Sequence, residues 1–288
     1  MNEIKNRHKD KIEMLRKKYQ HNSSSHAFAS LYLWQHSMEL SVICEEDFFV
    51  VKNVLRGENA YFFPCGNDES IVEFLKSKIT EKSFSLCYLR SCDVKWLDEK
   101  FPGVWEFKRT EESDEYICDI SEYINLSGSK FSEIRRKIRK LERTHNLIAK
   151  PIAENTIQDA MSVVTDWYNG EHSEGIQHLT DDHIADMALS ERNILEISGI
   201  VLYADDVPVA VFAGFPLSDD TVDVLIGKTS TNAPKGIVYY GLREYLKTCT
   251  DRYTYCNHEE DLGIPGIRMV KESLCPIYKI QMWEAILK

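Results

Sequence analysis

Three consecutive apolar runs between residues 197 and 229 constrain the fold of this chain more than any other feature. They read ISGIVLYAD, DVPVAVFAGFPL and TVDVLIGKT, and short polar turns join them at Asp205-Asp206 and at residues 218–220. Strand-forming runs separated by such tight turns are typical of neighbouring antiparallel strands, because a parallel connection needs a much longer crossover. The sequence therefore predicts a β-meander, and with it a largely antiparallel sheet in this half of the chain.

The rest of the chain alternates between helix-like and strand-like patterns. In the first half we predict helices at 3–19, 27–36, 68–77 and 94–100, strands within 39–65 and at 83–90, and a final strand pair within 107–120. In the second half we predict helices at 129–145, at 156–168, from Thr180 and at 237–247, and further strands at 147–154, 252–257 and 276–287. This order predicts the mixed α/β class, with two units that we place at residues 1–125 and 126–288.

The composition is that of an ordinary globular protein. Hydrophobic residues make up 43% of the chain and charged residues 28%. No apolar run reaches the length that is needed to cross a bilayer. The first residues, MNEIKNRHKDK, are charged throughout and lack the apolar core of a signal peptide. We therefore expect a cytoplasmic protein without stable membrane insertion.

The eight cysteines and a group of three histidines do not form a recognisable metal site. No cysteine pair has C-x-x-C spacing, whereas zinc sites usually contain closely spaced ligands. His172, His178 and His183 are separated by six and five residues, which fits no common ligand pair on one helix. We expect buried, reduced thiols and no bound metal.

The helix predicted at 129–145 carries an unusual excess of positive charge. The chain as a whole has a formal net charge of −11, which argues against indiscriminate nucleic-acid binding. Between residues 130 and 150, however, eight cations accompany two acids, a local net charge of +6. The candidate phosphate-binding residues on this helix are Arg135, Arg136, Arg139, Lys140 and Arg143. Like charges at these spacings destabilise an isolated helix, so an anionic partner would explain them; a solvated surface helix is the alternative.

The stretch from residue 253 to residue 276, YTYCNHEEDLGIPGIRMVKESLCP, concentrates reactive side chains where a strand gives way to a turn. Asn257, Glu260 and Asp261 precede a Gly-Pro-Gly turn. Arg268 and Lys271 follow the turn, in a short helix predicted to begin near residue 265. A strand end is a usual place to hold catalytic groups on a rigid frame. A solvated acidic turn with structural ion pairs would have the same sequence, so both interpretations stay open.

Five stretches of the chain resemble one known family. In chain order they are SSSHAFASLYLWQHS, YINLSGSKFSEIRRKIRK, PVAVFAGFPL, PKGIVYYGLREYL and CNHEEDLGIPGIRMVKES. They are similar to soluble relatives of the C-terminal catalytic domain of bacterial phosphatidylglycerol lysyltransferases, and the similarity is spread over nearly the whole chain. It implies two tandem GNAT-like acyltransferase domains. The chain departs from the family pattern at His258, Met269-Val270 and Leu274, where the pattern has an arginine, an uninterrupted basic run and an aromatic residue. These departures bear on substrate specificity more than on fold.

The resemblance implies aminoacyl transfer. Larger members of the superfamily, including the Fem ligases, move an aminoacyl group from aminoacyl-tRNA to an amine or a hydroxyl. In such a reaction Glu260 or Asp261 would be the base or the anchor of an acceptor amine, and Asn257 would orient the substrate. Arg268 or Lys271 would stabilise developing negative charge or hold the 3′ end of the tRNA. The basic helix would contact tRNA phosphates.

The loop before the helix at 237–247 bears on the choice of donor. Conventional GNAT enzymes hold the CoA pyrophosphate on a glycine-rich loop whose backbone N–H groups point at the phosphates. The equivalent residues 229–236 contain one glycine and one proline, which disfavours CoA, although Lys235 is a candidate phosphate ligand. We expect aminoacyl-tRNA as donor, a small molecule or peptide as acceptor, and no cofactor. The alternatives are an N-acyltransferase that uses acyl-CoA or an acyl-carrier protein, and a non-catalytic binding protein.

Overall fold

The computed structural model describes residues 1–81, 83–173 and 184–288, without the side chains of residues 171–173. Its residues form two compact units. Unit 1 consists of Met1–Tyr116, Glu259–Arg268 and Lys279–Lys288, and unit 2 consists of Ile117–His258 and Met269–Tyr278. The C-terminal part of the chain therefore contributes to both units. The domain boundary near residue 125 stays a prediction, because compact units and domains need not coincide.

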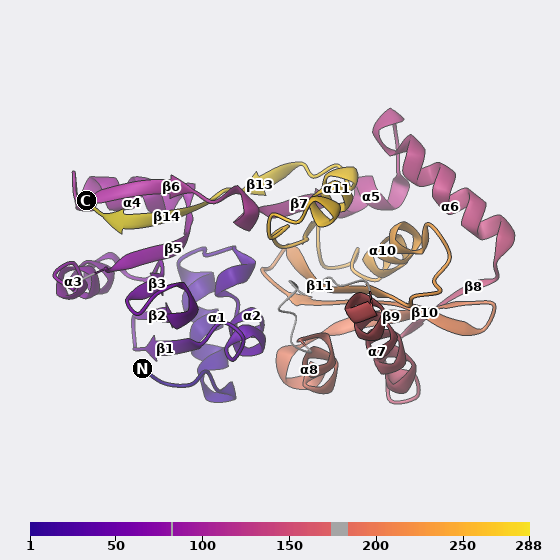
Figure 1. Ribbon diagram of the computed structural model, residues 1–288, viewed down its shortest axis with the longest axis horizontal. Helices are drawn as coiled ribbons and strands as arrows, with labels where there is room; N and C mark the ends of the chain where they lie inside the picture. The colour runs from indigo at the N-terminus through magenta and orange to yellow at the C-terminus, as the bar shows by residue number, and fades with distance from the viewer. Residues whose placement is uncertain (82, 174–183) are drawn as a thin grey trace. The chain divides into compact units, whose positions relative to one another are not determined.

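Unit 1 is built on a sheet with the strand order β1-β2-β3-β5-β14-β6, in which β4 also pairs with β2 (Figure 1). Its strands are β1 (Leu40–Cys44), β2 (Phe48–Asn53), β3 (Ala60–Phe62), β4 (Cys65–Gly66), β5 (Ser85–Arg90), β6 (Trp105–Arg109) and β14 (Met282–Leu287). The β3–β5 pair is parallel, and the other pairs are antiparallel. The last strand of the chain, β14, lies between β5 and β6 and so completes the interior of this sheet.

The helices of unit 1 form where the apolar periodicity predicts them. They are α1 (Lys9–Lys18), α2 (Phe28–Trp34), α3 (Asp68–Lys78) and α4 (Ser91–Lys100). The start of α3 is fixed by its sequence, because Asn67 Oδ1 accepts the Ser70 N–H at 2.7 Å and so caps the first turn. Phe74 and Leu75 of α3 and Leu97 of α4 are buried in one apolar core with residues of β5 and β14.

The second sheet has the strand order β13-β7-β12-β11-β10-β9-β8. Its strands are β7 (Glu115–Asp119), β8 (Leu147–Pro151), β9 (Ser198–Ala204), β10 (Val207–Pro216), β11 (Thr221–Thr229), β12 (Tyr255–Asn257) and β13 (Tyr278–Ile280). The predicted meander is confirmed as the antiparallel strands β9, β10 and β11. β12 joins β11 in parallel and β7 antiparallel. The predicted mixed α/β class with mostly antiparallel sheets is confirmed.

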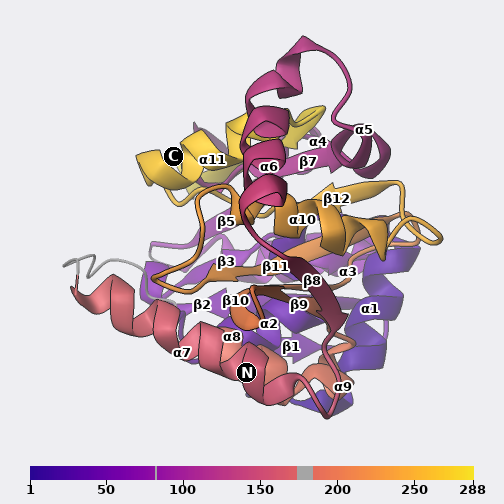
Figure 2. The same cartoon turned by 90° about the vertical axis from the view of Figure 1, so that its right-hand side faces the viewer.

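The remaining helices of the chain are α5 (Ile120–Asn125), α6 (Ser132–Thr144), α7 (Ile157–Ser173), α8 (Ile184–Ser190), α9 (Arg192–Leu195), α10 (Ile237–Lys247) and α11 (Pro265–Ser273). Two of them, α7 and α10, pack on the second sheet. In Figures 1 and 2, α10 lies on one face and α7 on the other, with α6 on the outer side of α10. The apolar stripe of α6, Ile134, Ile138 and Leu141, is buried in a core with α10. In the described part of the chain, no helix is long and apolar enough to cross a membrane.

Two strand predictions are wrong. Two strands form close to the predicted range 107–120, β6 beginning two residues before it, but they do not pair: β6 pairs with β14 and β7 with β12, in different sheets. The single strand predicted at 276–287 is two strands, β13 and β14, again in different sheets. Alternation of apolar and polar residues reports which face of a strand is buried, and it carries no information about the partner strand. The helix start predicted at Thr180 lies outside the described residues.

Candidate functional site

Asp261 is the centre of a hydrogen-bonded network within unit 1. Its side chain is completely buried. Oδ1 accepts the Gly263 N–H at 2.8 Å and Arg268 Nη2–H at 3.0 Å. Oδ2 accepts Arg268 Nε–H at 2.8 Å and the Tyr116 hydroxyl at 2.5 Å. Gly263 has a φ of +71°, so the turn that brings its N–H back to Asp261 uses a conformation that favours glycine.

This network decides the charge of Asp261. Burial acts to raise the pKa of the carboxyl group, but hydrogen bonds from Arg268, Tyr116 and the Gly263 N–H outweigh it, and the pKa lies below its ordinary value. The hydrogen bond to Asp261 raises the pKa of Arg268 in turn. Asp261 is therefore a carboxylate at neutral pH with both oxygens occupied. This geometry suits a residue that holds Arg268 in position better than one that removes a proton.

Glu260, the neighbouring acid, has a different environment. It is half-buried, and its negative charge contributes, after burial, to a raised pKa of the Tyr88 phenol. Tyr88 lies within β5 with a φ of +54°, a left-handed conformation that a tyrosine seldom adopts. Arg56 lies over the Tyr88 ring at 5.1 Å from its centroid. Unit 1 thus gathers a carboxylate, a phenol and a guanidinium near one strained backbone position, as functional sites often do.

A serine-rich turn makes a hydrogen bond to the 253–276 stretch, and its residues are not among the predicted site residues. In the 3-10 helix η2 (Ser24–His26), Ser24 Oγ donates to Glu259 Oε1 at 3.4 Å. The backbone N–H groups of Ser24 and Ser25 donate to the two carboxylate oxygens of the buried Glu115, at 2.9 and 3.3 Å. The only sequence signal for this turn is the SSSH stretch of the family resemblance. Tyr116 carries no such signal, because 145 residues separate it from Asp261.

The remaining predicted catalytic residues, Asn257 and Lys271, belong to unit 2. Asn257 is completely buried as the last residue of β12, in register with Asp223 of β11 and Ile117 of β7. Lys271 is half-buried on α11. Of the five residues predicted for the chemistry, the structure joins Asp261 directly to Arg268. A shared catalytic role for the five stays a prediction.

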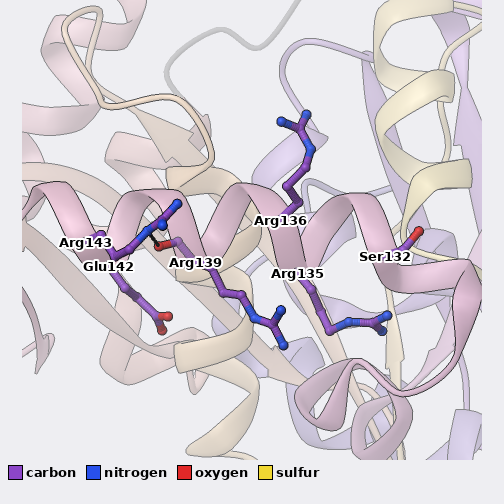
Figure 3. Close-up of a pocket in the computed structure, with 6 residues that line it drawn as sticks. All are labelled: Ser132, Arg135, Arg136, Arg139, Glu142 and Arg143. Atoms are coloured by element: carbon purple, nitrogen blue, oxygen red, sulfur yellow. Dashed lines mark hydrogen bonds between the residues drawn. The ribbon is translucent and has the colours of Figure 1, made fainter.

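An open pocket of about 610 Å³ extends along the basic helix α6 (Figure 3). The residues that line it are Ser132, Arg135, Arg136, Arg139, Glu142 and Arg143. Figure 3 shows Arg135 and Arg139 extending to one side of the helix and Arg136 to the other. The pocket therefore contains four of the five cations predicted to bind phosphate on this helix.

Two acids of α6 are neutralised by specific partners. Glu133 accepts Arg136 Nη2–H at 2.7 Å and Nε–H at 3.0 Å. Glu142 accepts Arg243 Nη2–H, from α10, at 2.7 Å. The Arg135 guanidinium donates instead to the carbonyl oxygens of residues 126 and 128, and among the described residues it has no ion pair with an acid. The bonds of Arg135 fix the start of α6. Glu133 also lies 4.0 Å from Lys137 Nζ, so neither acid pairs with Arg139, Lys140 or Arg143.

Besides Arg136, which pairs with Glu133, three cations of α6 are exposed to solvent: Arg139, Lys140 and Arg143. Arg143 Nε–H donates to the Arg139 carbonyl oxygen at 3.2 Å. Within the described ranges, none of the three has a carboxylate within ion-pairing distance. Uncompensated like charges on adjacent turns repel one another. A surface with these uncompensated positive charges is suited to bind a polyanion.

In the loop at residues 229–236, both donors of Thr231 are occupied. Asp166 Oδ2, from α7, accepts both the Thr231 N–H at 2.6 Å and the Thr231 hydroxyl at 3.0 Å. A Cβ at Gly236 would lie 3.3 Å from the Lys137 carbonyl oxygen, so α6 lies close to the start of α10. A carboxylate on a backbone N–H and a carbonyl oxygen near the helix start both oppose a bound pyrophosphate. Lys235 is exposed on this loop.

The three histidines for which the sequence predicts no metal site fall outside what the structure describes. His178 and His183 lie outside the described residues, and the side chain of His172 is not described. Among the residues that are described, no group of three or more histidine, cysteine or acidic side chains is arranged to hold a metal ion.

Comparisons with known proteins identify one matching family and several solved structures with a similar fold. The family model described as phosphatidylglycerol lysyltransferase, C-terminal, matches residues 16–285. A conserved protein of unknown function from Bacteroides thetaiotaomicron VPI-5482 has a TM-score of 0.91 at 24% identity, and the match covers 100% of this chain and 99% of that one. L-PGS from Bacillus licheniformis has a TM-score of 0.64 at 15% identity, with 99% and 92% covered. FemX has a TM-score of 0.62 at 8% identity, with 99% and 96% covered. These structures show a shared fold, and no curated protein sequence matches the chain.

Proposed function

The chain belongs to the family of the phosphatidylglycerol lysyltransferase C-terminal domain, and on that premise we propose that it transfers an aminoacyl group from aminoacyl-tRNA to an amine or hydroxyl acceptor. The family match supports a transferase. The observation that carries the choice of donor is the set of cations on α6 without carboxylate partners among the described residues, Arg139, Lys140 and Arg143. We place the reaction in the cytoplasm, with a small molecule or a peptide as acceptor and with no cofactor.

An aminoacyl ester needs little further activation. The acceptor nitrogen or oxygen attacks the ester carbonyl carbon, the new C–N or C–O bond forms, and the ester C–O bond breaks. The acceptor loses a proton, and the tRNA ribose oxygen leaves as a hydroxyl. The protein must therefore orient the acceptor, take up the proton and stabilise the tetrahedral oxyanion.

Glu260 and Arg268 have the environments that these tasks require. Glu260 is a half-buried carboxylate beside a phenol, and we assign it the role of base. Arg268 donates two N–H groups to Asp261 while 43% of its side chain stays exposed, so an anionic substrate group can approach the rest of the guanidinium. Asp261 is then a positioning residue. Its two oxygens hold the guanidinium plane in one orientation.

The structure also supports tRNA over CoA as the donor. The Thr231 N–H, in the loop that would face a CoA pyrophosphate, already donates to the Asp166 carboxylate. A pyrophosphate there would have to displace a negative charge. The α6 pocket, in contrast, offers a row of cations about 6 Å apart along the helix axis, the rise of four residues, which suits successive phosphates of a nucleic acid.

The test is a transfer assay with a mixed pool of radiolabelled aminoacyl-tRNAs and cell extract as the source of acceptor. We expect salt-sensitive retention of tRNA and movement of label from tRNA to an acceptor. Glu260→Gln should lower transfer by about 100-fold or more while leaving retention unchanged. Glu73→Gln, on the exposed side of α3, is the matched control. Transfer that survives Glu260→Gln would exclude this residue as the base, and binding of acyl-CoA without retention of tRNA would favour the CoA-dependent alternative.

A further inference from the structure

Two cysteines face each other across adjacent strands of unit 2. β7 and β12 run antiparallel, and their register places Cys118 directly opposite Cys256. Both side chains are buried, with exposures of 1% and 0%. Cys256 Sγ lies 3.7 Å from the Cys118 carbonyl oxygen, so the sulfur of one strand reaches the backbone of the other. The two thiols therefore share one small volume between the strands.

The usual backbone distance between opposed residues of an antiparallel pair suits a covalent bridge. Residues directly opposite each other in an antiparallel pair have Cα atoms about 4.5–5.5 Å apart. Disulfides span Cα separations of about 4.4–6.8 Å. A bond between the two sulfurs would thus require rotation of side chains and little movement of either strand.

The surroundings of the pair favour ionisation of one thiol. His258 Nε2 lies 3.4 Å from Cys256 Sγ, which makes a cluster of two thiols and an imidazole. The hydrogen bond from the Cys256 thiol lowers the pKa of Cys118, and the hydrogen bond from His258 adds to this effect. Burial raises the pKa of Cys256, which therefore stays protonated as the donor. The thiolate is the nucleophilic form of cysteine, so Cys118 is the more reactive member.

The other cysteines lack this combination. Burial raises the pKa of Cys65 and of Cys87 to about 12, and it also raises the pKa of the exposed Cys92. Cys249 and Cys275, the nearest competitors, also have raised pKa values. Neither is the register partner of Cys118 or Cys256. Cys118 and Cys256 combine the two features, because they lie opposite each other on paired strands and one of them has a stabilised thiolate.

We propose that Cys118 and Cys256 are a redox-active dithiol that hydrogen peroxide oxidises to a cross-strand disulfide. The Cys118 sulfur attacks the peroxide, the O–O bond breaks, and a sulfenic acid forms with release of water. The Cys256 sulfur then attacks the Cys118 sulfur, the S–S bond forms, and hydroxide leaves with the thiol proton as a second water. The two thiols lose two electrons in total, and the peroxide gains them.

Oxidation would change the segment that follows β12. The Cys256 thiol would no longer contact His258, which stands between Asn257 and Glu259 in the 253–276 stretch. Because both sulfurs are buried, the reaction proceeds through local opening of β12, a strand of three residues. The inference does not depend on the proposed aminoacyl transfer, since the disulfide is detected by its mass.

Trypsin places the four thiols of this region in separate peptides: 110–130 with Cys118, 248–252 with Cys249, 253–268 with Cys256 and 272–279 with Cys275. The reduced full-length protein is treated with hydrogen peroxide, blocked with N-ethylmaleimide, digested without reduction and analysed by mass spectrometry. We expect peptide 110–130 linked to 253–268, lighter than the two free peptides by two hydrogen atoms. Dimedone present during oxidation should trap a sulfenic acid on Cys118.

Variants separate this pairing from its competitors. Cys118→Ser should abolish the link, and Cys275→Ser should leave it unchanged. A link from 110–130 to 272–279, a link from 253–268 to 248–252, or unmodified Cys118 after oxidation of Cys92 would each overturn the proposal. The peptide map of the unsubstituted protein decides between these outcomes even if Cys118→Ser fails to fold.

Discussion

The α6 surface makes a quantitative prediction about salt. Arg139, Lys140 and Arg143 are exposed and have no carboxylate partner in the part of the chain that the structure describes. Each phosphate that a protein neutralises contributes about 0.7–0.9 to the slope of log affinity against log salt concentration. Substitution of all three by glutamine, which keeps a high helix propensity, should therefore reduce the magnitude of that slope by about 2–3. Between ~50 and ~200 mM salt, the unsubstituted protein should lose about 20–40-fold more affinity than the variant.

The assay is filter binding of deacylated tRNA over a series of salt concentrations, with far-UV circular dichroism to confirm that α6 is retained. The matched control removes three positive charges elsewhere, with Lys76→Gln, Lys95→Gln and Lys108→Gln at exposed positions of unit 1. Its slope should equal that of the unsubstituted protein, because net charge alone releases no bound counterions from tRNA. Equal slopes for the α6 variant and the unsubstituted protein would refute the assignment of this helix to phosphate contacts.

Three further predictions concern stability and donor choice. In urea titrations, Gly241→Ala should lower the free energy of unfolding by about 1–3 kcal/mol, because the new Cβ would lie 2.2 Å from Phe212 Cε2. Gly266→Ala should be neutral or stabilising, because among the described residues no atom outside its chain neighbours and its own helix backbone lies within 4 Å of the new Cβ. Asp261→Asn should lower the free energy of unfolding by about 1.5–3 kcal/mol at neutral pH. Because the pKa of Asp261 is lowered in the folded protein, the carboxylate stabilises the fold above its ordinary pKa, and this stabilisation is lost as the pH falls through the folded pKa. The free energies of unfolding of the two proteins should therefore converge in acid. CoA should leave the melting temperature unchanged, because Asp166 occupies the Thr231 N–H; a rise in the melting temperature would contradict that reasoning.

The sequence predicts where the helices and strands of this fold form much better than which strands pair with one another. The spacing of apolar residues places α3, α6 and α10 close to their observed bounds, since a helix buries a face that its own residues define. β6 and β7 are close in sequence and lie in different sheets, as do β13 and β14. Strand partners are chosen by the packing of distant segments, which no local pattern records.

The candidate site shows the same limit. Asp261 and Arg268 are seven residues apart, and their types and spacing make a pair predictable. Tyr116 and Ser24 reach the same segment from positions 145 and 235 residues away, and only the fold brings them there. For Asp261 the sequence leaves two roles open, the base or the anchor of an acceptor amine. The four hydrogen bonds to its oxygens, which only the fold reveals, suit a residue that holds Arg268 in position.

The position of β14 has a consequence for how this protein is made. β5 and β6 leave the ribosome long before β14, the strand of residues 282–287 that lies between them in the sheet and pairs with both. Translation of the intervening residues takes roughly 9–35 s at ~5–20 residues per second. The meander of unit 2 is complete well before then, so the part of the chain that is synthesised first is the last to close its sheet. During that interval each nascent chain presents two unpaired strand edges, which is where we expect chaperones to bind.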